Sequence, residues 1–184
     1  MSDRARGYLP ARAAAITLTT AGGPLDIIGA YAPSRDASAA KTDRKRKWLH
    51  ACLTELAADR GRTQIFLGDL NVLEPGHQPS YRFFSEFEYD FYRRLTSECG
   101  LIDAFRHCHP DLIDHSWVGR TGDGYRYDHL HISVDLLPRL TACDYVHQPR
   151  IGKLTDHSGL TACLALDAEA GLITSDPTMS GTLL

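Results

Sequence analysis

Two segments with a helical spacing of apolar residues, each set between short apolar runs, constrain the fold of this chain more than any other feature. Apolar side chains recur every three or four positions over 42–59 and again over 81–98, which predicts two helices. Thr42 or Asp43 is expected to cap the first helix, and Gly100 to end the second. Long helices that alternate with strands predict a layered α/β domain.

Short apolar runs bounded by turn residues predict the strands of this domain. Gly22-Gly23-Pro24 separates the first two runs, so we expect these strands to form a hairpin. A hairpin argues against a purely parallel sheet. The predicted strands, with one short extended piece after the second helix, are Ala13–Thr20, Leu25–Tyr31, Gln64–Leu67, Leu101–Phe105, His115–Val118, Tyr125–Val134 and Leu160–Leu166.

Length and hydropathy set the expected domain boundaries. The 184 residues suffice for one domain with a sizeable core. We place this domain at 13–168, after an irregular lead-in over 1–12 and before a flexible tail over 169–184. No apolar run approaches the roughly 20 residues that a membrane span needs. The first residues lack the apolar core of a signal peptide, so we expect a cytoplasmic protein.

Cysteine spacing and net charge exclude some classes of protein. The five cysteines form no CxxC pair, which favours reduced, buried thiols over a zinc ribbon or a disulfide framework. The net charge of −3 argues against a protein that binds nucleic acid through an overall basic surface. Any contact with nucleic acid is therefore expected to be local.

Polar side chains gather at the ends of three predicted strands. Asp69 and Asn71 follow one strand, Asp128 lies within another, and Asp156 and His157 directly precede the last. Taken singly, each has an ordinary explanation as a turn, a helix cap or a satisfied core carboxylate. Side chains at strand ends, however, are held by a rigid sheet at its rim, where sites are usually built. Together they form a candidate active site.

Phosphodiester hydrolysis needs the residue types found at these positions. A carboxylate can take the proton of an attacking water, and a metal ion or an imidazolium can stabilise charge on the phosphoryl oxygens. The imidazole needs a partner that fixes its orientation, commonly a carboxylate. We therefore predict that all five side chains converge at one rim of the sheet and that the ring of His157 bonds to Asp128.

Six stretches resemble, in order, the endonuclease/exonuclease/phosphatase superfamily in its exonuclease III and abasic-endonuclease branch. They are IIGAYAPS (27–34), IFLGDLNV (65–72), GLIDAFRHCHPD (100–111), HSWV (115–118), GYRYDHLHIS (124–133) and TDHSGL (155–160). The third stretch favours this branch over the sphingomyelinase-like and inositol-phosphatase branches. The resemblance implies a layered α/β sandwich of the DNase I-like type. It also implies a Mg²⁺- or Mn²⁺-dependent phosphodiesterase, a nuclease acting on DNA in repair.

The resemblance implies a role for each residue at the strand ends. Asp69 orients or deprotonates the attacking water, and Asn71 holds that water and a phosphate oxygen. His157, oriented by Asp128, stabilises the pentacovalent transition state. Asp156, together with Asn71, belongs to the metal site.

Substrate contacts are implied in the same way. Tyr31 is expected to touch the scissile phosphate. Trp117, Tyr125 and Tyr127 stand where the family places the apolar wall of its sugar pocket, and Arg126 lies between the two tyrosines as a further substrate-binding candidate. The alternative for the aromatic residues is ordinary core packing.

The first part of the family pattern has no counterpart in this chain. Family members carry a metal-site Asn and then a metal-ligand Glu on two strands before the Tyr-x-Pro segment. Here no Glu or Asn precedes Tyr31, and the only earlier carboxylates are Asp3 and Asp26. We therefore expect an N-terminally incomplete domain with a weak metal site and little activity alone. Its exposed sheet edge could allow self-association.

Two further features keep more than one function open. The basic run Lys41–Lys47 lies at a helix start, where positive charge opposes the helix dipole, so it is either a solvated face or an anion contact. His129 and His131 point to one face of a strand, as zinc ligands can, which keeps a zinc-binding module as an alternative. A phosphatase or small-molecule phosphodiesterase and a non-catalytic nucleic-acid-binding remnant stay open as well.

Overall fold

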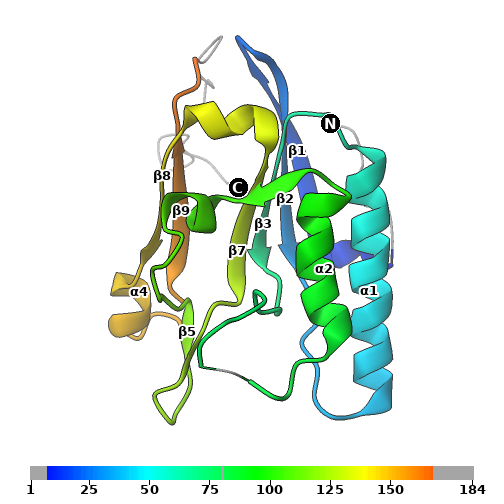
Figure 1. The fold of residues 1–184 in the computed structure, drawn as a ribbon, viewed down its shortest axis with the longest axis vertical. Coiled ribbons are helices and arrows are strands. Elements are labelled where there is room, and N and C mark those ends of the chain that lie inside the picture. Colours follow the sequence, from blue (N-terminus) through cyan, green and yellow to red (C-terminus); the bar gives the residue numbers. More distant parts are fainter. Residues whose placement is uncertain (1–7, 80, 168–184) are drawn as a thin grey trace, which may run out of the picture.

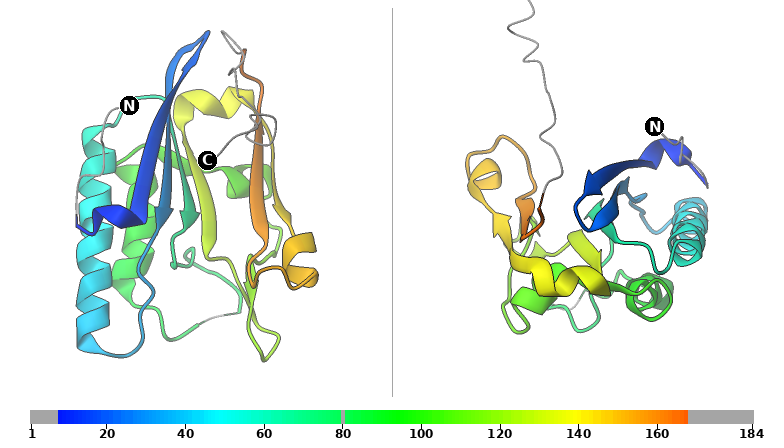
Figure 2. Two further views of the ribbon diagram at one scale, coloured as in Figure 1. Left: turned by 180° about the vertical axis from the view of Figure 1, so that it is seen from behind. Right: turned by 90° about the horizontal axis from the view of Figure 1, so that it is seen from above.

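A five-stranded sheet with different elements packed on its two faces forms the centre of the molecule. The computed structural model describes residues 8–79 and 81–167. Two helices cover one face of this sheet, and a separate two-stranded sheet lies on its other side (Figures 1 and 2). This confirms the predicted layered α/β arrangement. The covering elements are helices α1 (Ala39–Ala58) and α2 (Glu86–Ser97) and strands β8 (Leu140–Val146) and β9 (Gly159–Leu164).

Mixed strand directions in the central sheet determine where its polar strand ends meet. The strand order is β1-β2-β3-β7-β4. Strands β2 and β3 are parallel, and the other neighbouring pairs are antiparallel. The ends of β2 and β3 therefore meet the start of β7 at one rim. The strands are β1 (Ala13–Thr20), β2 (Gly23–Tyr31), β3 (Gln64–Asp69), β4 (Leu101–Asp103) and β7 (Asp128–Ser133).

Short elements connect these layers. The strands β5 and β6 form a small hairpin below the rim, and α3 packs close to β7 and β8. Within the described residues no helix combines the length and apolar character that crossing a membrane requires. The connecting elements are the 3-10 helices η1 (Pro10–Arg12) and η2 (Val134–Arg139), the helices α3 (Ala104–Cys108) and α4 (Gln148–Ile151), and the strands β5 (Trp117–Val118) and β6 (Gly124–Tyr125).

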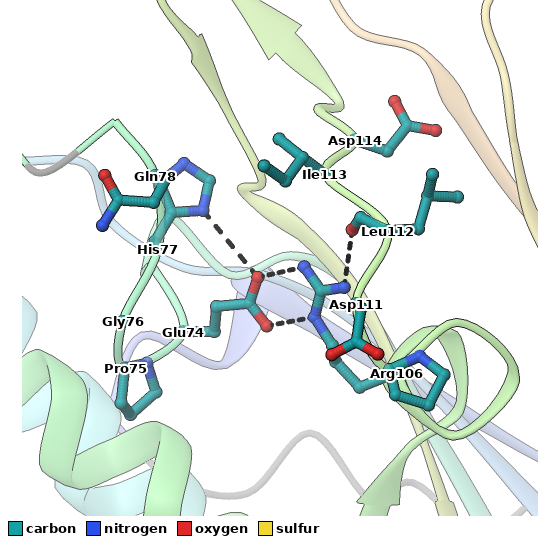
Figure 3. Close-up of a pocket in the computed structure, with 11 residues that line it drawn as sticks. Glu74, Pro75, Gly76, His77, Gln78, Arg106, Asp111, Leu112, Ile113 and Asp114 are labelled. Carbon is teal, nitrogen blue, oxygen red and sulfur yellow. Dashed lines mark hydrogen bonds and ion pairs between the residues drawn. The ribbon is translucent and has the colours of Figure 1, made fainter.

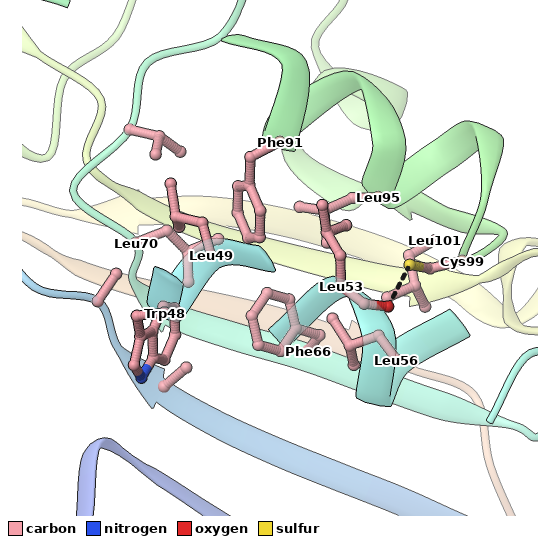
Figure 4. Packing of buried hydrophobic residues seen from close by; sticks show 13 residues of the cluster. Trp48, Leu49, Leu53, Leu56, Phe66, Leu70, Phe91, Leu95, Cys99 and Leu101 are labelled. Atoms are coloured by element: carbon pink, nitrogen blue, oxygen red, sulfur yellow. Dashed lines mark hydrogen bonds between the residues drawn. The ribbon is translucent and has the colours of Figure 1, made fainter. Parts of the chain in front are cut away.

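The apolar core between the helices and the sheet holds β3 in place (Figure 4). Trp48 and Leu49 on α1 and Phe91 and Leu95 on α2 enclose it with Phe66 of β3, and each side chain is at most 3% exposed. Burying an apolar side chain of this size contributes about 1.5–3 kcal/mol. Because β3 passes through this core, its polar C-terminal end is anchored on a rigid support.

Both long helices begin at different residues from those predicted. The cap of α1 is Ser38, whose hydroxyl accepts from the backbone N–H of Lys41, rather than Thr42 or Asp43. Helix α2 begins at Glu86, later than predicted, where Ser85 and Glu88 form a capping box. In both cases a serine just before the apolar stripe satisfies the first helical N–H groups.

The strand predictions were right for the hairpin and for β3, and less complete towards the C-terminus. Strand β8 was missed, because Asp144 and the small residues of this segment interrupt its apolar alternation. The piece predicted as extended over Leu101–Phe105 is a strand only as far as Asp103, after which α3 begins. The predicted tail over 169–184 lies outside the described residues.

Candidate active site at the rim of the sheet

Three of the predicted site residues meet at one rim because of strand register. Tyr31 at the end of β2 pairs with Asp69 at the end of β3, and Asp69 pairs with Asp128 at the start of β7. His157 joins them from the loop before β9, and its Nδ1 lies 2.7 Å from Oδ2 of Asp128. The predicted convergence of Asp69, Asp128 and His157 is therefore confirmed.

A tight turn after β3 orients the Asp69 carboxylate. The backbone N–H of Asn71 donates to Oδ1 of Asp69 over 3.0 Å, and the Asn71 side chain donates through Nδ2 to the carbonyl of Ala32, also over 3.0 Å. Asn71 adopts a left-handed backbone with φ 50°. Gly68 is needed here, because a Cβ on it would lie 1.9 Å from the carbonyl oxygen of Ala30. Asn71 thus contacts Asp69 through its backbone N–H, whereas its side chain, predicted to join the other four, bonds to Ala32.

Backbone pairing fixes the loop that carries His157. His157 forms an isolated antiparallel bridge with Trp117, and the N–H of Ser158 donates to the carbonyl of Ser116 over 2.7 Å. The Ser116 hydroxyl in turn accepts from the N–H of Asp128 over 3.1 Å. One buried serine therefore ties together both segments that supply the Asp–His pair.

Burial and hydrogen bonding at the rim shift the pKa values of the two residues best placed to move protons. Burial, and then the nearby charge of Asp128, raise the pKa of Asp69 to about 6. The hydrogen bond that the ring of His157 donates to Asp128 raises the pKa of His157 above its usual 6.5, against the effect of its burial. Near neutral pH the site therefore combines an ionised carboxylate with an imidazole that favours its cationic form.

Asp156 and Tyr31 lie at the open side of this rim. Asp156 is exposed and accepts a hydrogen bond from the indole Nε1 of Trp117 over 3.3 Å. Tyr31 is 54% exposed, and the guanidinium of Arg12 lies 5.0 Å from its ring centroid. Both side chains are accessible to a ligand, as their predicted roles require.

A group of aromatic rings borders the rim. Tyr125 and Tyr127 stack with centroids 5.6 Å apart, and Trp117 lies 6.0 Å from the first and 5.9 Å from the second. Tyr81 and Phe84, from the segment before α2, add to the group at 4.9 Å from Tyr125 and 6.0 Å from Tyr127. Tyr125 is buried within this group, so the partly exposed faces of Trp117 and Tyr127 are the ones available for contact.

Comparisons with known proteins give one curated relative and several solved structures that are similar to this chain. No family model matches the sequence. A curated exodeoxyribonuclease of Bacillus subtilis (strain 168) is 30% identical over 125 residues, which make up 60% of this chain and 49% of that protein. The chain thus spans about half the length of this curated relative.

Solved structures share the fold. An AP endonuclease from Archaeoglobus fulgidus matches with a TM-score of 0.70 and 24% identity, over 82% of this chain and 64% of that one. The catalytic domain of Xenopus laevis APE2 matches with a TM-score of 0.71 and 18% identity, over 87% and 56%. The 3′ phosphatase NExo from Neisseria, bound to a product DNA hairpin, matches with a TM-score of 0.70 and 21% identity, over 82% and 64%.

This chain has the fold of the AP endonuclease, APE2 and NExo structures. One predicted substrate-binding residue, Arg126, lies in the interior of this fold. Arg126 is 0% exposed and donates to Glu74 and Asp103, each over 2.7 Å, and to the hydroxyl of Tyr92 over 3.1 Å. Arg126 is therefore a buried structural cation, out of reach of a substrate.

The buried charge network continues to a surface cavity of about 290 Å³ (Figure 3). Glu74 lines it and is held by both Arg106 and Arg126, which lower the pKa of its carboxyl although burial alone would raise it. The exposed side of the cavity carries Asp111 and Asp114. Because its arginine and glutamate bind one another, this cavity has no free cation among its described lining residues.

The two histidines considered as zinc ligands lie in the core. His129 and His131 are 0% exposed and pack edge-on to Tyr92, with centroids 5.4 Å away in each case. His129 donates or accepts through Nε2 with the carbonyl of Val72 over 3.0 Å. Across 8–79 and 81–167, no three His, Cys, Asp or Glu side chains form a group that could hold a metal ion. The described residues therefore give the zinc hypothesis no site.

Proposed function

We propose that this chain carries the hydrolytic site of a DNA phosphodiesterase of the exonuclease and abasic-endonuclease type. The observation that carries the proposal is the meeting of Asp69 with the Asp128–His157 pair at one rim. A carboxylate and an imidazolium placed on opposite sides of one phosphate are what a water attack requires. The exodeoxyribonuclease and AP endonuclease among the similar proteins support DNA as the substrate.

The proposed mechanism assigns one task to each side chain. Asp69, with its pKa near 6, accepts the proton of the attacking water. His157, held through Nδ1 by Asp128, presents its other ring nitrogen to a phosphoryl oxygen and stabilises the charge that develops there. Tyr31 contacts the phosphate from the exposed side, and the exposed faces of Trp117 and Tyr127 border the sugar.

The binding of a divalent cation, Mg²⁺ or Mn²⁺, stays a prediction. A hard dication requires several oxygen ligands, and the described residues offer only Asn71 and Asp156 in the predicted metal role, without a group of three acidic, His or Cys ligands. These residues alone do not fit a complete metal site. We therefore assign no step of the mechanism to a cation, and expect Mg²⁺ or Mn²⁺ to bind this chain weakly. Self-association through the edge strand β1, whose residues Ala13–Thr20 carry no charge, also stays a prediction.

The proposal is tested by incubating the purified chain with duplexes that carry an abasic site, a free 3′ end or a 3′-phosphate, with Mg²⁺, Mn²⁺ or EDTA. Slow strand cleavage is expected, and the arms with Mg²⁺, Mn²⁺ and EDTA show whether it depends on a cation. Release of inorganic phosphate alone would indicate a phosphatase, the second candidate that the likeness to the 3′ phosphatase NExo favours. Salt-dependent DNA binding with no product on any substrate would mark a non-catalytic remnant and contradict the proposal.

A separate prediction concerns the pKa of His157 in the Asp128–His157 pair. Asp128→Asn should lower the pKa of His157, because it removes the main cause of the upward shift. The pair stabilises the fold fully below pH 6.5, and this stability is lost as pH rises through the raised pKa. NMR titration of the ring protons measures the change. Asp144→Asn, which removes the separate His109–Asp144 pair, is the matched control and should leave His157 unaffected. An unchanged His157 titration in Asp128→Asn would contradict the pairing.

A further inference from the structure

One lysine of the basic run lies in the interior. Lys45 on α1 is 1% exposed. Its neighbours Lys41 and Lys47 form ion pairs at the surface, with side chains 51% and 61% exposed. Burying an ammonium group costs several kcal/mol unless its donors are satisfied. A lysine in this place therefore has specific partners.

The partners of Lys45 connect α1 to the active-site turn. Its Nζ donates to the backbone carbonyl of Asn71 over 2.5 Å and to Oε1 of Glu88 over 2.6 Å. Glu88 is 0% exposed and also accepts from Arg35, through Nε over 3.0 Å and Nη2 over 2.6 Å. The ring of Phe84 lies 5.0 Å from Nζ. The ammonium is thus held by one carboxylate and aimed at one peptide group of the turn.

That peptide group belongs to the residue that orients the catalytic carboxylate. Asn71 has a left-handed backbone, which a non-glycine residue adopts only when its surroundings hold it. Its carbonyl binds Lys45 while its N–H binds Oδ1 of Asp69. Without Lys45, the Asn71 carbonyl would be left without its charged donor and the turn could relax. The link from Lys45 to Asp69 runs through a single residue.

We propose that Lys45 is a positioning residue that holds the Asp69–Asn71 turn in its reactive conformation. The expected loss of activity rests on the proposed function. The expected relaxation of the turn rests on the contacts of Lys45 alone. Lys45 does not touch the reacting atoms. Its loss is expected to lower kcat about 10–100-fold, as misplacement of a catalytic group by about 1 Å does. KM should change little, because the substrate-facing side chains remain.

The test compares Lys45→Met with the wild-type chain. In Lys45→Met the buried Glu88 keeps its ion pair with Arg35, so no carboxylate is left without a cation. Lys45→Arg is the conservative rescue, and Lys47→Met, which removes a surface charge from the same helix, is the control. The readouts are kcat and KM on the DNA substrate, and hydrogen exchange of the Asn71 amide beside those of Ile65 and Phe66 in β3.

The expected result is at least tenfold faster exchange at Asn71 with unchanged exchange in β3, a lower kcat at similar KM, and recovery of both in Lys45→Arg. Lys47→Met should match the wild type. Equal acceleration at Asn71 and in β3 would show that Lys45 only stabilises the fold, and unchanged exchange at Asn71 would also overturn the proposal. A wild-type chain without turnover contradicts the proposed function, while the exchange measurement still decides the role of Lys45.

Discussion

Replacing Asp69 with asparagine is expected to lower kcat for DNA cleavage by about 10²–10⁴-fold, the usual contribution of a general base. Asparagine keeps the shape of the side chain and can still accept from the N–H of Asn71, so the turn after β3 should persist. What it loses is the ability to take a proton. The change is measured in single-turnover assays on the substrate that the wild-type chain cleaves.

The pH dependence adds a second signature to this variant. In the wild type, activity should fall as pH drops through about 6, where Asp69 becomes protonated. It should fall again as pH rises through the raised pKa of His157, where the imidazolium is lost. Asp69→Asn should abolish the acidic limb and keep the basic one. Asp90→Asn on the exposed side of α2 is the control, and the same loss in that variant would remove the specific role of Asp69.

The largest effect on stability is expected from Arg126→Met. This variant should destabilise the fold by about 3–5 kcal/mol, because removing one partner of a buried ion pair leaves an uncompensated charge. Arg126 is the buried cation between Glu74 and Asp103. Burial alone would raise the pKa of Asp103, but Arg126 and neighbouring groups hold it well below its usual value. Without the arginine this carboxylate has to protonate or become hydrated. Urea unfolding followed by circular dichroism measures the difference.

A surface ion pair supplies the comparison for Arg126. Arg93 pairs with Glu86 on the exposed side of α2 over 2.6 Å. Exposed pairs contribute about 0–1 kcal/mol, so Arg93→Met should leave the unfolding midpoint almost unchanged. If Arg126→Met were as mild as Arg93→Met, the buried network would not be a main support of the fold.

The candidate site was largely predictable because it depends on strand ends. An apolar run that stops at Gly68-Asp69 identifies both a strand and the side chain at its end, and sheet register then brings Asp128 beside it. The pairing with His157 followed from chemistry, since an active imidazole needs a carboxylate to orient it. Spacing along the chain gave no distance between them, and only the loop anchored at Ser116 supplies it.

Arg126 and Lys45 could not be placed correctly from charge alone. Arg126 stands between two aromatic residues, in the short link between β6 and β7, and its side chain is buried in the core. A signal for Lys45 was present, because it lies three positions before Trp48 and four before Leu49, on the apolar stripe of α1. Because Lys45 stands among other basic residues, from the sequence it is interpreted as part of one charged run and not as part of this stripe. Its partner Glu88 is 43 positions away, a separation that only the packing of α1 against α2 closes.

The most direct test of the account is a double-mutant comparison of Asp69→Asn, His157→Gln and the combined variant in single-turnover cleavage of the preferred DNA substrate. If both side chains act on the same phosphate, each single variant should lose most of the rate, and the combined variant should be about as slow as the slower single one. Losses that simply multiply would show that the two residues act independently. That result would contradict the claim that they form one site at the rim of the sheet.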